Sequence, residues 1–173
     1  YEIDQGSDGS DNASASYSYG DNGVSAYDED SDNNGDSDLS ITYQYDDEGK
    51  RISQRVNTST AGLPSNAGTF EYDNNGNITR YEQDNNLDGR ADYIESSSYD
   101  SNNKRTSYRR DIDANGTWDS VTQYTYDAVG NRTSMNEDSD GDGTIDKQWS
   151  SNYETTHHES GWDLILGKLD SET

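Results

Sequence analysis

The sequence predicts an all-β fold of antiparallel β-hairpin repeats, about six units of 27 residues, that form a curled sheet, a sandwich or a solenoid. Three observations predict it. Tyrosines recur at a nearly constant spacing, a turn sequence with Gly or Asn follows most of them, and helical periodicity is missing from the repeats.

The tyrosine repeat sets the register of the whole chain. The recurring residues are spaced by 26 and then 27 residues, and Gly follows four residues later in most units. Asn103 and His157 take the place of that Gly in the other two units. The repeated tyrosines are Tyr19, Tyr45, Tyr72, Tyr99, Tyr126 and Tyr153.

Each unit has the pattern of a hairpin. Residues 121–126 alternate in polarity and are rich in strand formers, residues 127–131 form a turn sequence, and residues 132–135 begin a return strand. Large side chains recur at one return-strand position, so we expect an aromatic stripe on one sheet face that supplies much of the core. The return-strand residues are Tyr1, Tyr27, Tyr81, Tyr108 and Met135, with Gln54 breaking the series.

Composition narrows the functional classes. Only 26% of residues are hydrophobic and the formal charge is −24, which alone would favour disorder. The 14 Tyr, the 3 Trp and the regular spacing of the acids argue for a folded chain. The charge excludes nucleic acid and anionic lipid as partners, and no apolar run is long enough to span a membrane. Cysteine is absent, no signal peptide is visible in the sequence and it does not begin with Met, so we expect a mature or truncated product.

A second element, D-x-D-x-D-G-x-x-D, recurs in register with the tyrosines. Its last acid stands seven residues before the repeated Tyr in every full copy. A weaker copy holds Asp4, Asp8 and Asn12, and residues 57–65 keep the Gly but lose the acids. The side chains of the four full copies are Asp30, Asp32, Asn34 and Asp38; Asp84, Asn86, Asp88 and Asp92; Asp111, Asp113, Asn115 and Asp119; and Asp138, Asp140, Asp142 and Asp146.

These loops have the chemistry of calcium ligands. Calcium takes six to eight oxygen ligands, and side chains at positions one, three and five of a tight loop converge on one point. The acid at position nine would close the site, and packed carboxylates repel one another unless a cation lies among them. The simpler alternative is that Asp, Asn and Gly only form surface turns. We predict four calcium sites, and a fifth if the weaker copy at residues 4–12 binds.

Two resemblances follow from these motifs. The loop is similar to the calcium loops of thrombospondin type 3 repeats, which implies calcium binding without an EF-hand helix pair. Residues 124–134, with Tyr124, Tyr126-Asp127, Gly130 and Asn131, resemble the YD repeat of the RHS family, and residues 43–52 and 70–79 match nearly as well. The YD resemblance implies β-hairpins strung into a curled sheet on secreted or surface proteins.

No catalytic motif stands out, and we expect no enzyme. His157 and His158 are the chain's two histidines and lie beside Glu159 near its end, away from any nucleophile motif. The acids are already assigned to calcium by the repeat. Five N-x-[ST] sequons make glycans candidate partners, although the repeat itself creates most of them.

Two functions fit the prediction of calcium-binding hairpin repeats, and both place the chain outside the cell. One is a calcium-stabilised structural subunit of a filament or surface appendage, which polymerises head-to-tail with itself. The other is a calcium-dependent adhesin or carbohydrate-binding module of a larger surface protein. We divide the chain into a repeat domain at 1–160 and an apolar tail at 161–173, which either caps its own sheet or joins a neighbouring subunit as a strand.

Overall fold

A computed structural model describes residues 2–3, 13–59, 63–158 and 161–165. The chain divides into two compact units, Tyr1–Tyr93 and Ile94–Thr173, and each is described by itself. No helix in the described part of the chain is long and apolar enough to span a membrane.

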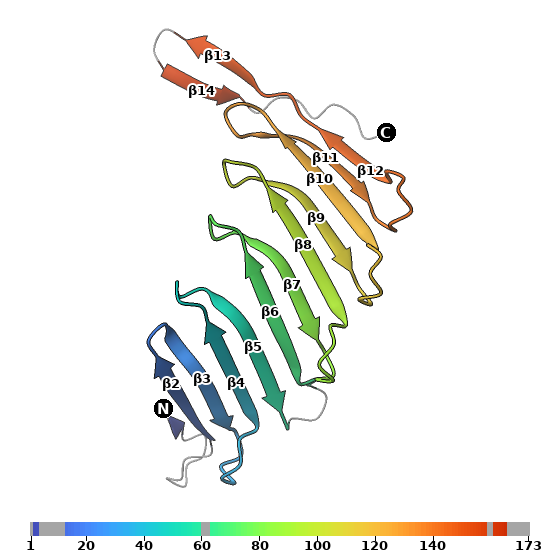
Figure 1. Cartoon of the computed structure of the whole chain (residues 1–173). Coiled ribbons are helices and arrows are strands. Elements are labelled where there is room, and N and C mark those ends of the chain that lie inside the picture. The colour runs from blue at the N-terminus through green and yellow to red at the C-terminus, as the bar shows by residue number, and fades with distance from the viewer. Residues whose placement is uncertain (1, 4–12, 60–62, 159–160, 166–173) are drawn as a thin grey trace. The chain divides into compact units, whose positions relative to one another are not determined.

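Unit 1 is an antiparallel sheet whose strands are neighbours in the order of the sequence (Figure 1). Hairpins β2–β3, β4–β5 and β6–β7 repeat along it, and each has a register shift just before its repeated tyrosine. The strands are β1 (Glu2–Ile3), β2 (Ala13–Gly20), β3 (Gly23–Asp30), β4 (Leu39–Tyr45), β5 (Arg51–Thr58), β6 (Asn66–Tyr72) and β7 (Ile78–Asp84).

Unit 2 repeats the same pattern in β8 (Tyr93–Tyr99), which begins at the unit boundary, β9 (Arg105–Asp111), β10 (Ser120–Tyr126), β11 (Arg132–Asp138) and β12 (Lys147–Ser150). A separate two-stranded sheet follows, formed by β13 (Glu154–His158) and β14 (Gly161–Ile165). The described start of the expected tail is therefore a strand paired with the segment before it. Residues 166–173 lie outside the described residues.

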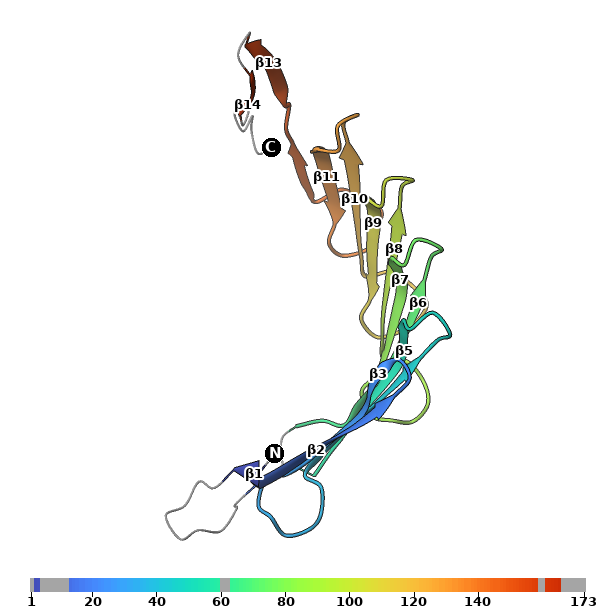
Figure 2. The same ribbon diagram turned by 90° about the vertical axis from the view of Figure 1, so that its left-hand side faces the viewer.

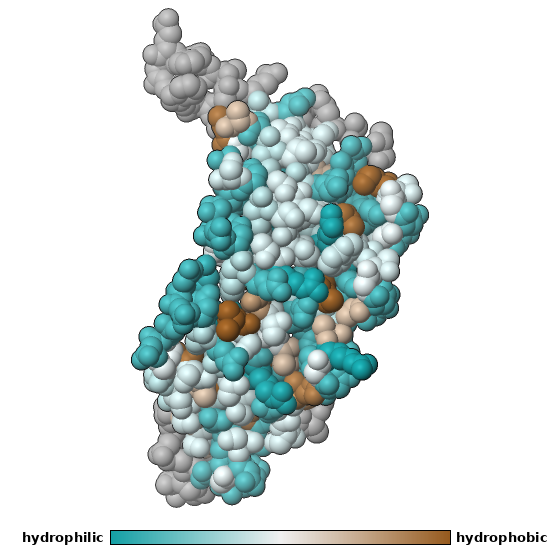
Figure 3. All heavy atoms as spheres, in the orientation of Figure 1, coloured by the Kyte–Doolittle hydropathy of each residue, from teal (hydrophilic) through white to brown (hydrophobic). Residues whose placement is uncertain are grey.

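The all-β hairpin prediction is confirmed, but the expected aromatic core is not found. Figure 2 shows a single layer of strands in each unit, with no described element packed across a face. Among the described residues no hydrophobic side chain is fully buried, and Tyr126 is only half-buried. A single layer shields its side chains only through their neighbours in the same sheet. In the view of Figure 3, hydrophilic side chains gather along the edges of unit 2, where the turns and loops lie.

In four hairpins the turn is fixed by the Asp that follows the repeated tyrosine. In the turn after β10, Asp127 Oδ1 accepts hydrogen bonds from the amides of Val129 and Asn131 at 3.0 and 2.8 Å. Gly130 has φ +91°, a left-handed conformation in which L side chains are strained. The same bonds recur at Asp46, Asp73 and Asp100. Hydrogen bonds from Asn77 keep the pKa of Asp73 below its usual value.

The repeated tyrosine joins one hairpin to the previous one. Its hydroxyl donates to a backbone carbonyl 21 residues earlier: Tyr45 to Val24 at 2.9 Å, Tyr72 to Arg51 at 2.7 Å and Tyr126 to Arg105 at 2.8 Å. Each of these bonds ties a hairpin to the first residues of the preceding return strand, so the offset between the two hairpins is the same each time.

We expect Tyr126→Phe to lower the free energy of unfolding by about 1 kcal/mol, the usual net contribution of a hydrogen bond. Urea denaturation followed by circular dichroism measures the change. Tyr19→Phe is the control, because the Tyr19 side chain is 72% exposed and that variant should be neutral. Equal losses for both variants would contradict the proposed role of the hydroxyl.

Arginines stack between aromatic rings of successive hairpins. The Arg51 guanidinium lies 5.7 Å from the Tyr43 ring centre and 4.8 Å from that of Phe70 in the next hairpin. In unit 2, Arg132 lies between Tyr124 and Trp149 at 5.7 and 4.9 Å. Such contacts attract through the ring quadrupole, so they hold neighbouring hairpins together without a buried core.

Candidate metal centres

The acidic loops connect a return strand to the next outgoing strand. Loop 30–38 joins β3 to β4, loop 84–92 follows β7, loop 111–119 joins β9 to β10, and loop 138–146 joins β11 to β12. All four have one backbone form, with the fourth residue at positive φ and Gly at the sixth position also at positive φ. The fourth-position residues are Asn33, Leu87, Ala114 and Gly141, with φ of 54°, 60°, 51° and 72°.

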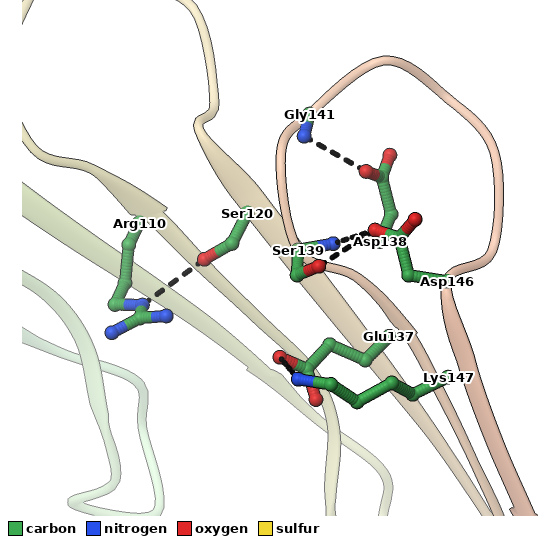
Figure 4. A network of polar contacts seen from close by, with 8 residues as sticks. All are labelled: Arg110, Ser120, Glu137, Asp138, Ser139, Gly141, Asp146 and Lys147. Atoms are coloured by element: carbon green, nitrogen blue, oxygen red, sulfur yellow. Dashed lines mark hydrogen bonds and ion pairs between the residues drawn. The ribbon is translucent and has the colours of Figure 1, made fainter.

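The first acid of each loop holds the turn at position six. The amide of that Gly donates to the first carboxylate at 2.8 Å in all four loops, as from Gly143 to Asp138 Oδ2. Asp138 also accepts from the amide of Gly141 at 2.8 Å (Figure 4). Two of these first acids are buried, Asp111 at 2% and Asp138 at 6% exposed, whereas Asp30 and Asp84 are half-buried.

The last acid closes the loop from the other side. In loop 138–146, Asp146 Oδ2 accepts from the amide and the hydroxyl of Ser139, both at 2.7 Å (Figure 4). The second-position amide makes the same bond to the last acid in the other loops. Hydrogen bonds from Ser139 keep the pKa of Asp146 below its usual value, and those from Ser31 and Ser59 do the same for Asp38.

Three of the four loops bring the acids at positions one, three and nine together. In each group, one oxygen atom per carboxylate lies within 4.8 Å of the others. The groups are Asp30, Asp32 and Asp38; Asp111, Asp113 and Asp119; and Asp138, Asp140 and Asp146. Loop 84–92 has an amide, Asn86, at position three, so it offers fewer carboxylates.

The fifth residue of each loop makes a local turn of its own. Asn34, Asn115 and Asp142 use Oδ1 to accept from the amide two residues later, at 2.7–2.8 Å. In the same way, Asp88 Oδ1 accepts a hydrogen bond from the Arg90 amide at 2.9 Å. The carboxylates at positions one, three and nine therefore lie close together in three of the loops. The side chain at position five, which was also an expected ligand, instead accepts a hydrogen bond from a backbone amide of its own loop.

The residues present fit a divalent cation of the calcium type. The donors are carboxylate and amide oxygens, which are the ligands that calcium prefers. Among the described residues, no ion pair joins a loop acid to a basic side chain. Amide hydrogen bonds orient the carboxylates but leave their mutual repulsion in place, so a cation between them would stabilise the loop.

The weaker copies differ in what the structure describes. Asp4, Asp8 and Asn12 lie outside the described residues. In the loop at 57–65, Ser65 replaces the last acid, and its hydroxyl accepts from the Thr58 amide at 3.0 Å. The closing bond of the loop therefore survives without a carboxylate, which shows that this contact has a structural role of its own.

Neighbouring loops touch, which the sequence did not indicate. In unit 1, the Ser59 hydroxyl donates to Asp38 Oδ1 at 2.9 Å. In unit 2, Gly141 lies against the backbone of Trp118, and a Cβ at Gly141 would overlap the Trp118 carbonyl oxygen. The sequence shows a serine directly after the first acid in two of the loops. No sequence pattern, however, identifies Ser59 as a hydrogen-bond partner of Asp38. His157 and His158 lie in β13.

Comparison with known proteins identifies no family for the chain. No family model matches it, and no curated protein matches it. Among solved structures, a Photorhabdus luminescens Tc holotoxin pore is similar at 11% sequence identity and a TM-score of 0.44. The alignment covers 90% of this chain, which spans 11% of the chain it matches. The hairpin architecture is established by the strand pairing of the chain itself.

Proposed function

We propose that the chain is a calcium-stabilised structural subunit of an extracellular filament or surface appendage, built from YD-like hairpins and calcium loops, and that it associates with copies of itself. One observation carries this proposal: the same group of three acids recurs at one register of a hairpin repeat. A catalytic site is usually a single arrangement of residues that occurs once in a chain. A site that recurs in several repeats instead fits a repeat protein, in which each repeat and each contact between repeats adds its own contribution to the stability of the fold.

The low apolar content supports the same role. Because no described hydrophobic side chain is fully buried, the hairpins depend on contacts along the sheet rather than across a core. A cation bound in each loop would therefore add stability that a hydrophobic core does not supply. Repeat sheets also have unpaired edges, which favour addition of further strands.

Electron microscopy of the purified chain tests the function. With millimolar calcium we expect long fibres of uniform width, and with excess chelator we expect them to be lost. Monodisperse particles in calcium would instead favour the adhesin or carbohydrate-binding role. Fibres that form equally well in chelator would separate self-association from calcium and refute the proposal as stated.

A further inference from the structure

The strand register of unit 1 separates its charges between the two faces of the sheet. Residues directly opposite each other in an antiparallel pair share a face. Tyr17 pairs with Tyr27 and Tyr27 with Ile41. The pairings of β4 with β5 and of β5 with β6 carry the same face to Phe70, which pairs with Tyr81, so these side chains share one face. We call the face of β2–β7 that carries them the aromatic face.

Contacts between side chains confirm this face. The rings of Tyr17 and Tyr27 lie 4.9 Å apart, and those of Phe70 and Tyr81 lie 5.0 Å apart. Gly68 lies beneath the Tyr81 ring, where a Cβ would come within 2.9 Å of it. Arg51 bridges Tyr43 and Phe70 from the same side. The face therefore carries aromatic rings in all three hairpins.

This surface is almost free of the charge that the chain carries elsewhere. Among the paired positions of β2–β7, the aromatic face has two charged residues, Glu29 and Arg51, which cancel. The opposite face has a net negative charge from Asp28, Asp30, Arg55, Glu71, Arg80, Glu82 and Asp84. In a chain of formal charge −24, a neutral aromatic sheet face is a distinct surface.

The aromatic face is accessible in the single chain. No described element packs across it (Figure 2), and Tyr17, Tyr19 and Ile78 on it are 47%, 72% and 41% exposed. Tyrosine-rich surfaces of this kind are typical of protein interfaces, since the rings combine large contact area with a polar hydroxyl.

We propose that this aromatic face packs against the same face of a second copy of the chain. The inference rests on the proposed self-association and names the surface that performs it. Two like-charged chains repel wherever acids meet, and the neutral aromatic face is where two copies approach without that repulsion. A twofold contact places the same patch on both partners, so a surface without net charge complements itself.

The area of the aromatic face is large enough for an interface with a second copy of the chain. Strands lie about 4.8 Å apart and rise about 3.4 Å per residue, so the strands β2–β7 present roughly 700 Å² of sheet. A standard interface buries about 800 Å² per partner. Such a contact would supply the second layer that each sheet lacks, and it would join filaments laterally because a twofold contact closes on itself.

Cysteine labelling tests the proposal, because the chain has no native Cys. Tyr17→Cys places a thiol on the aromatic face, and Ser16→Cys places one on the opposite face at the next residue, which is also exposed. In calcium, at a concentration where sedimentation shows association, we expect maleimide to label the Tyr17→Cys thiol about tenfold more slowly than in dilute protein, because an interface core excludes solvent. The Ser16→Cys rate should not change. The pair Tyr19→Cys and Ser18→Cys repeats the comparison if Tyr17→Cys folds poorly.

The outcomes separate this inference from the proposed function. Association with equal labelling of both faces would show that copies meet elsewhere, and it would overturn the inference alone. Protection of Ser16→Cys instead of Tyr17→Cys would overturn it as well. A chain that stays monomeric at every concentration in calcium would refute the proposed self-association and the inference together.

Discussion

Excess chelator is expected to lower the melting temperature of the chain strongly, and this is the largest effect that the structure predicts. A ligand that binds only the folded state stabilises it by about 4 kcal/mol per site at a thousandfold excess over Kd. With several loops and no fully buried hydrophobic side chain among the described residues, loss of the ion removes a large share of the total stability. Thermal unfolding followed by circular dichroism, with calcium and with chelator, measures the effect.

Single-residue variants connect that effect to the loops. Asp32→Ala removes one member of the acid group in loop 30–38, whereas Asp36→Ala removes an exposed acid of the same loop that lies outside the group. Native mass spectrometry in calcium should count one ion fewer for Asp32→Ala and an unchanged number for Asp36→Ala. A melting curve that does not respond to chelator would contradict calcium stabilisation altogether.

Gly141→Ala is expected to destabilise unit 2 by about 2–5 kcal/mol, because two penalties coincide. Overpacking typically costs about 1–3 kcal/mol, and the new Cβ would overlap the carbonyl oxygen of Trp118 in the neighbouring loop. The residue also has φ +72°, and a left-handed conformation costs an L residue about 1–2 kcal/mol. Urea denaturation in the presence of calcium measures the loss.

Gly143→Ala provides the matched control in the same loop. Gly143 also has positive φ, at 89°, but no atom lies within 4 Å of a Cβ built on it. It should therefore show only the conformational penalty. Ala114→Gly, at the position of loop 111–119 that corresponds to Gly141, should be neutral or slightly stabilising. Equal losses for Gly141→Ala and Gly143→Ala would show that the loops do not pack as described.

The repeat made the hairpins predictable from sequence, because their turns are encoded locally. Asp127 and Gly130 specify a turn through bonds that span four residues, so the pattern alone located strands β10 and β11 closely. The same holds for the acidic loops, where Asp138 and Gly143 lie five residues apart and make the bond that closes the turn. Local hydrogen bonds leave a local signature in the sequence.

Contacts between units of the repeat were not predictable in this way. The position of Arg51 between Tyr43 and Phe70 depends on the lateral spacing of strands, which the pattern of one hairpin does not contain. The expected aromatic core failed for a related reason. Alternating strands indicate that one face is apolar, but they do not indicate whether a second layer covers it. The contact of Gly141 with Trp118 depends on backbone approach and left no residue pattern.

The bonds from Tyr45, Tyr72 and Tyr126 to carbonyls 21 residues earlier have a consequence for how the chain folds. All of the described strand pairings within each unit, like these bonds, join parts of the chain that are close in sequence, so the contact order is low for a β protein. A hairpin can form as soon as its own residues and the preceding return strand are available. Folding can therefore proceed in step with the emergence of the chain from the ribosome, one repeat at a time.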